Sequence, residues 1–80
     1  MPQVQRENIP RALMEHLAQR IRERQVAITD LQDLARWLDG KPEVPEGDWY
    51  KRFSTMTVCG RGALVKTFLT AAQIPVGREQ

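Results

Sequence analysis

The spacing of apolar residues changes in the middle of this chain, in the segment KPEVPEGD, residues 41–48. Before this segment apolar residues recur every three or four positions, as on one side of a helix, and after it β-branched and aromatic residues are concentrated, as in strands. The segment holds two prolines, a glycine and three acids, which is typical of an ordered, irregular loop. The sequence therefore predicts a single α+β domain over residues 1–80. Its parts are an N-terminal arm (1–8), a helical hairpin (9–40), the acidic loop (41–48), a β-hairpin (49–70) and a C-terminal tail (71–80).

Two amphipathic helices are predicted before the acidic loop. The first covers residues 10–25, and its apolar stripe comprises Leu13, Met14, Leu17, Ala18 and Ile21. The second covers residues 30–39, with a capping-box pattern at Thr29 and Gln32 and a left-handed C′ position at Gly40. Its apolar face comprises Leu31, Leu34, Ala35 and Leu38, with Trp37 at the margin. Because few residues separate the helices, we expect an αα-hairpin in which the two stripes bury each other.

An antiparallel β-hairpin is predicted after the acidic loop, with strands at residues 49–59 and 63–70 around a turn at Gly60, Arg61 and Gly62. Turns of two, three or four residues all fit, so the register stays open. Every register leaves apolar side chains on both faces of the ribbon. We therefore expect the helix pair, the C-terminal segment, a second subunit or a ligand to cover the second face. A C-terminal strand or a second subunit would complete the sheet.

The small size of the chain favours self-association. A domain of 80 residues buries only about 60 to 65% of the surface that its unfolded form exposes, which leaves little stability. The single cysteine, Cys59, cannot form an internal disulfide, so we expect a homodimer or another protein partner and a reducing, cytoplasmic location. The start MPQVQRENIP does not resemble a signal peptide, and no apolar run approaches the roughly 18 residues of a membrane span. No membrane association is expected.

The sequence does not predict a catalytic centre, a cofactor or a metal site. His16 is the only histidine, and it lies with Arg20 and Arg24 on one flank of the first predicted helix without an acid in the same row. Cys59 stands beside the turn, where Arg61 would favour its thiolate, but a lone cysteine is more often a small buried apolar residue. The run CGRG joins two strands, so its glycines indicate a turn rather than a phosphate-binding loop. An enzyme that uses Cys59 or His16 is the third hypothesis for function.

Nucleic-acid binding is the second hypothesis, because residues 49–78 contain cations and aromatic side chains but no acid. Cations neutralise phosphates, and exposed aromatic rings stack on unpaired bases. The candidate residues, which include the arginine flank of the first helix, are Arg20, Arg24, Tyr50, Lys51, Arg52, Arg61 and Lys66. The second predicted helix carries mainly acids, so it should not contact phosphates.

The first hypothesis is a small non-catalytic protein-interaction or self-assembling module. Aromatic residues are favoured at the centres of interfaces, and this chain has several near the ends of predicted elements. The candidate interface residues are Trp37, Trp49, Phe53, Leu64 and Phe68. The competing interpretation is that the tryptophans fill the space between helices and sheet. Exposure of Phe53, Phe68 and Lys66 would make the hairpin a binding surface, and their packing would place the function elsewhere.

The stretches WYKRF, CGRG and KTFL, within about the last 30 residues, resemble small uncharacterised bacterial proteins that have a strand, a Cys-Gly-x-Gly turn and a second strand. The resemblance implies a bacterial or mobile-element origin. It implies no activity, cofactor or residue role.

Overall fold

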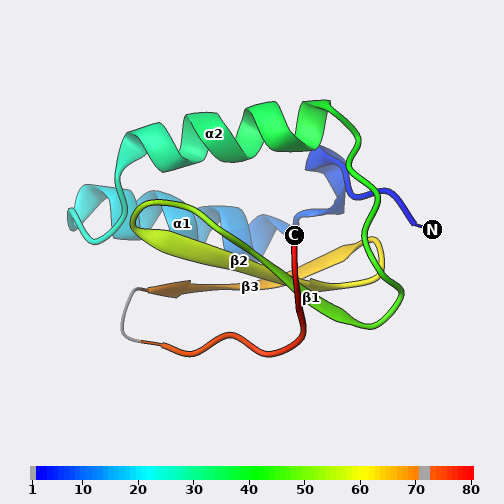
Figure 1. The fold of residues 1–80 in the computed structure, drawn as a ribbon. Helices are drawn as coiled ribbons and strands as arrows, with labels where there is room; N and C mark the ends of the chain where they lie inside the picture. The colour runs from blue at the N-terminus through cyan, green and yellow to red at the C-terminus, as the bar shows by residue number, and fades with distance from the viewer. Residues whose placement is uncertain (1, 71–72) are drawn as a thin grey trace.

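The structure is a computed structural model that describes residues 2–70 and 73–80, and it confirms the α+β class (Figure 1). Two helices precede a four-stranded sheet, and both pack on the same face of it. The elements are η1 (Arg6–Asn8), α1 (Arg11–Arg22), α2 (Ile28–Asp39), β1 (Asp48–Arg52), β2 (Met56–Arg61), β3 (Leu64–Thr70) and β4 (Arg78–Glu79).

The sheet has the strand order β3-β2-β1-β4 and is mixed. The pairs β1–β2 and β2–β3 are antiparallel, whereas β4 runs parallel to β1. The chain after β3 therefore passes across the outer face of the sheet, away from the helices, to reach the opposite edge, as the orange-to-red trace in Figure 1 shows. Ile74 and Val76 share a hollow on this face with Cys59, Thr67 and Leu69. The C-terminal segment is thus what completes the sheet and crosses its second face.

The prediction of one strand over residues 49–59 is wrong, because the chain reverses within this range. The Phe53 amide donates to the Met56 carbonyl oxygen at 2.8 Å, which closes the turn between β1 and β2. This turn is held from outside. The Asp30 carboxylate accepts hydrogen bonds from the amide and the hydroxyl of Thr55, each at 2.6 Å. A contact between residues 25 positions apart thus sets the strand boundary.

The turn between β2 and β3 has two residues, Gly62 and Ala63, because Arg61 is paired with Leu64. Gly62 has a φ of +57°, in the left-handed region that glycine adopts without strain. The register then shifts by one residue, since Gly60 is paired with Val65 but Cys59 with Thr67. Lys66 is therefore the extra residue of a β-bulge.

The helix ends differ from those expected. α2 begins at Ile28 with Ala27 as its N-cap, so Thr29 is a helical residue and not a cap. At the other end Gly40 has a φ of −74°, and the left-handed residue is Lys41 with a φ of +50°. The structure places α1 at Arg11–Arg22, which is shorter than the predicted range.

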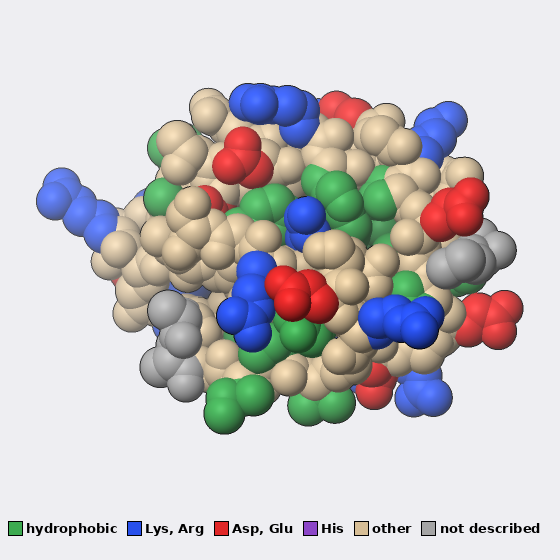
Figure 2. All heavy atoms as spheres, viewed as in Figure 1, with side chains coloured by type: hydrophobic (Ala, Val, Ile, Leu, Met, Phe, Trp, Pro, Cys, Tyr) green, Lys and Arg blue, Asp and Glu red, His purple; other side chains and the backbone are tan. Residues whose placement is uncertain are grey.

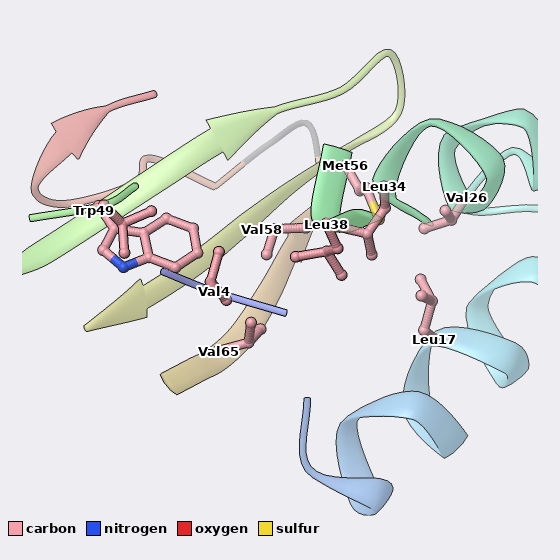
Figure 3. Packing of buried hydrophobic residues seen from close by; sticks show 10 residues of the cluster. Val4, Leu17, Val26, Leu34, Leu38, Trp49, Met56, Val58 and Val65 are labelled. Atoms are coloured by element: carbon pink, nitrogen blue, oxygen red, sulfur yellow. The ribbon is translucent and has the colours of Figure 1, made fainter. Parts of the chain in front are cut away.

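The core joins the helices, the sheet and both irregular segments. Figure 3 shows Leu34 and Leu38 of α2 gathered with Met56 and Val58 of β2, while Leu17 of α1 lies opposite Val26. The fully or nearly fully buried apolar residues are Val4, Leu17, Val26, Leu34, Leu38, Val44, Trp49, Met56, Val58 and Val65.

The N-terminal arm is part of the packed fold. Val4 and Val44, from the arm and the acidic loop, are both fully buried. The Val4 amide donates to the Pro42 carbonyl oxygen at 3.2 Å, and the Val44 amide donates to that of Pro2 at 2.8 Å. Across the described residues, no helix has the length and apolar character needed to cross a membrane.

Candidate functional site

The five predicted interface residues do not form one surface. Trp49 is fully buried, and its Nε1 donates to the Gly62 carbonyl oxygen at 2.8 Å. The Trp37 ring lies 5.7 Å from that of Trp49, centroid to centroid, with 60° between the ring planes. Phe53 and Phe68 are half-buried and pack against the core, so only Leu64, with 53% of its surface exposed, is open to solvent. The tryptophans fill the space between helices and sheet, which was the competing interpretation.

The predicted nucleic-acid residues are also dispersed. Lys51 Nζ lies 6.0 Å from the centroid of the Trp37 ring, on the helix side of the sheet. Arg52 stacks over Tyr50 at 5.6 Å on the outer side, and its Nε lies 3.8 Å from the Glu79 carboxylate. Figure 2 shows positive and acidic side chains close together where the C-terminus meets the sheet.

The remaining cations lie elsewhere. Arg61 is paired across the strands with Asp48, and Lys66 is exposed at the bulge. Arg20 donates to the side chain of Gln25 at the end of α1, and Arg24 is exposed in the following turn. Acids just outside the acid-free segment therefore fold back onto it. Nucleic-acid binding stays a prediction.

The two residues considered for catalysis lie on opposite sides of the sheet. His16 is exposed on α1, whereas Cys59 faces outward from β2 beside the C-terminal segment. The structure does not bring them together. Within residues 2–70 and 73–80, no cluster of three or more His, Cys, Asp or Glu residues could hold a metal ion.

The Cys59 thiol is expected to react slowly. Partial burial raises its pKa, and the Lys66 ammonium only partly offsets this increase. The thiol is therefore protonated near neutral pH, while the thiolate is the reactive form. We expect a maleimide-type reagent to label Cys59 more slowly than a free cysteine peptide at pH 7.5, with the rate rising as pH increases. Lys66→Gln should slow labelling further at each pH, and labelling faster than the peptide would contradict this prediction.

The structure leaves an apolar groove between α1 and α2, which we call the helix groove. It has a volume of about 400 Å³ and is lined by Arg6, Ile9, Met14, Leu31, Gln32, Leu34, Ala35 and Leu38. The expectation that the two helical stripes bury each other is thus only partly correct. Leu17, Leu34 and Leu38 pack into the core above the sheet, so Met14 and Ala35 are left on the surface side of the helix pair.

The Arg6 guanidinium lies at one end of this groove and fixes η1 to α2. Its Nε and Nη2 donate to the two Asp39 carboxylate oxygens at 2.8 and 2.7 Å. This bidentate pair holds η1, and with it the neighbouring Ile9, beside α2. The groove therefore has a defined wall on the side of the N-terminal arm.

A second hollow separates α1 from the edge strand β3, and we call it the edge cleft. Its volume is about 180 Å³, and it is lined by Leu13, His16, Leu17, Arg20, Val26, Thr67, Phe68, Leu69, Thr70 and Gln73. Sequence reasoning found Arg20 and Phe68 as candidates for two different functions, but it missed both hollows. The sequence feature that could have indicated the edge cleft is the position of His16 and Arg20 on one flank of the apolar stripe of α1.

The single buried charged residue in the described part of the chain, Asp30, has a structural role. Its Oδ2 accepts the two hydrogen bonds from Thr55, and the Thr55 hydroxyl oxygen in turn accepts from the Ala27 amide at 2.8 Å. This network connects the start of α2 to the β1–β2 turn.

No model of a protein family, no curated protein and no solved structure matches this chain, so the resemblance of its C-terminal part to bacterial hairpin proteins stays a prediction.

Proposed function

We propose that this protein is a non-catalytic interaction module that self-associates through its helix groove. The observation that carries the proposal is the groove itself, about 400 Å³ of mainly apolar surface left open between two helices of a small domain. Burial of apolar surface is the main favourable term in association, and a domain of this size gains stability from a partner. The free thiol of Cys59 is consistent with a reducing, cytoplasmic location.

The charge distribution supports a second copy as the occupant of the groove. Residues 1–40, which include both helices, contain six arginines and six acids, so two helical layers can meet without net repulsion. The helices also carry exposed apolar side chains that could insert into the groove of a second copy, since Met14 is 39% exposed and Ile28 is 61% exposed.

A carboxylate placed in the helix groove is expected to convert the dimer to a monomer. Ala35→Glu should weaken dimerisation at least tenfold, on the order of the cost of burying an unpaired charge. Sedimentation equilibrium over a range of concentrations measures the change, and circular dichroism checks that the variant is folded. Met14→Glu provides a second test at the rim of the groove.

Ala18→Glu is the matched control, because Ala18 is exposed on α1 and does not line the groove. The same side-chain change there should leave the dimer intact. A monomer mass for the unaltered protein at every concentration would refute self-association. Equal weakening by Ala18→Glu and Ala35→Glu would show that the interface lies elsewhere.

A further inference from the structure

The strand β3 lies at one edge of the sheet, so one side of its backbone is not paired with another strand. Since the Met56 carbonyl is directed at β1, the alternate residues Thr57 and Cys59 direct their backbone groups at β3. The backbone N–H and C=O groups of their partners, Leu69 and Thr67, therefore point toward β2. The backbone N–H and C=O groups of Phe68, which lies between them, point away from β2 to the open edge of the sheet.

Thr70 is the next residue of β3 whose backbone groups should point to the open edge, and its hydrogen bonds confirm this direction. The Thr70 amide donates to the Gln73 side-chain oxygen at 3.0 Å, and the Thr70 carbonyl oxygen accepts from the Gln73 amide at 3.0 Å. Gln73 thus occupies the end of this edge. At Phe68, the carbonyl oxygen accepts a long hydrogen bond of 3.5 Å from the Thr67 hydroxyl. The backbone amide and carbonyl groups of Phe68 are thus directed at the open edge, where an additional strand could pair with them.

The edge cleft runs along this same stretch of β3 and has an apolar floor. Leu13, Leu17 and Val26 line it below the strand, while His16 and Arg20 lie on the α1 side. Its volume is about 180 Å³. The cleft can therefore accept one large apolar side chain from a strand that pairs with β3.

The charges around the edge select the occupant. Arg20 lies in the cleft and Lys66 is exposed on β3, and no acid lines the cleft among the described residues. Glu23 lies in the neighbouring hollow, where its carboxylate accepts a hydrogen bond from Gln19 at 3.1 Å. A lysine and a bulge on an edge strand disfavour pairing with a second copy of that strand, because they bring like charges together and disturb the ladder. The same lysine attracts an acidic strand.

We propose that the free edge of β3 binds an extended acidic segment of a partner protein, which adds as a strand beside Phe68 and inserts an apolar side chain into the edge cleft. Main-chain hydrogen bonds provide affinity in this mode, and alternate side chains provide specificity. Alternate residues of the added strand point to α1 or to the outer face. When an apolar residue of the added strand enters the cleft, the acidic residues on either side of it point to the outer face, where they meet Lys66.

The test uses three capped octapeptides in which valine alternates with glutamate, with serine or with lysine. Each is titrated into the ¹⁵N-labelled full chain, and amide chemical shifts are recorded. The glutamate peptide is expected to bind at least tenfold more tightly than the serine peptide, and the lysine peptide should not bind, as expected for complementary charge at a partly buried site. The largest shifts should lie at residues 66–70 and along the cleft side of α1.

Lys66→Gln should weaken binding of the glutamate peptide about fivefold or more, on the order expected for loss of one charge-assisted contact. Arg22→Gln is the matched control, because Arg22 is an exposed cation on α1 that does not line the cleft. It should change affinity by less than about twofold.

Several results would overturn the proposal. They are the absence of shifts at about 1 mM glutamate peptide, equal affinity for the three peptides, shifts centred on the helix groove, or equal effects of Lys66→Gln and Arg22→Gln. Tighter binding of an oligo(dT) strand at the same residues would assign the edge to nucleic acid instead. The edge cleft and the helix groove are different surfaces, so a failure of self-association leaves this test unaffected.

Discussion

Replacement of Gly60 by alanine is expected to lower the free energy of unfolding by about 3 kcal/mol or more. A Cβ atom at this position would lie 2.6 Å from the Leu64 carbonyl oxygen and 2.7 Å from Cε2 of Trp49. Neither neighbour can move easily. The indole of Trp49 is fully buried and bonded to the Gly62 carbonyl oxygen, and the Leu64 carbonyl belongs to β3.

Unfolding in urea, followed by tryptophan fluorescence, measures this loss. Domains of this length have a total stability on the order of 4 to 12 kcal/mol, so the variant should have a much lower midpoint or a sizeable unfolded population. Gly47→Ala is the matched control, because a Cβ atom there meets nothing within 4 Å. Its free energy of unfolding should stay within about 0.5 kcal/mol of that of the unaltered protein. Equal midpoints for the two variants would show that Trp49 does not pack on Gly60 as described.

The fold class was predictable from sequence because the helices and the acidic loop have strong local signals. The two apolar stripes and the prolines of residues 42–45 are enough to separate a helical part from a β part. The division of residues 49–59 into two strands was not predictable. The turn at residues 53–55 has the sequence Phe-Ser-Thr, which lacks glycine, asparagine and proline, and it depends on a carboxylate from α2.

The candidate sites were less predictable than the fold, because they depend on how elements pack. The sequence indicates that Met14, Leu31 and Ala35 belong to apolar stripes, but not that these side chains line a groove left between the helices. Val4 and Val44 are a second case in which packing, and not the sequence pattern, determines the position of a residue. Each is a single apolar residue in a polar, aperiodic segment, and each is fully buried through contacts between distant parts of the chain.

Replacement of Asp30 by alanine is expected to cost about 2 to 4 kcal/mol, because two hydrogen bonds to a buried carboxylate are lost and their donors stay partly buried. The Thr55 amide and hydroxyl both donate to Asp30 Oδ2, so one side chain supports both α2 and the β1–β2 turn. Chemical unfolding measures the cost. Asp33→Ala on the exposed face of the same helix is the control and should change stability by about 0.5 kcal/mol or less.

A double-mutant cycle separates this network from simple loss of packing. Thr55→Val keeps the shape of the side chain but removes the hydroxyl that donates to Asp30 and accepts from the Ala27 amide. If the three groups act as one network, the double variant should be more stable than the sum of the single losses predicts, by about 1 to 2 kcal/mol. Hydrogen exchange should also accelerate selectively at the amides of Ala27 and Thr55. Additive losses, or protection at these two amides that Asp30→Ala leaves unchanged, would mean that the turn between β1 and β2 is specified by its own residues and not by α2.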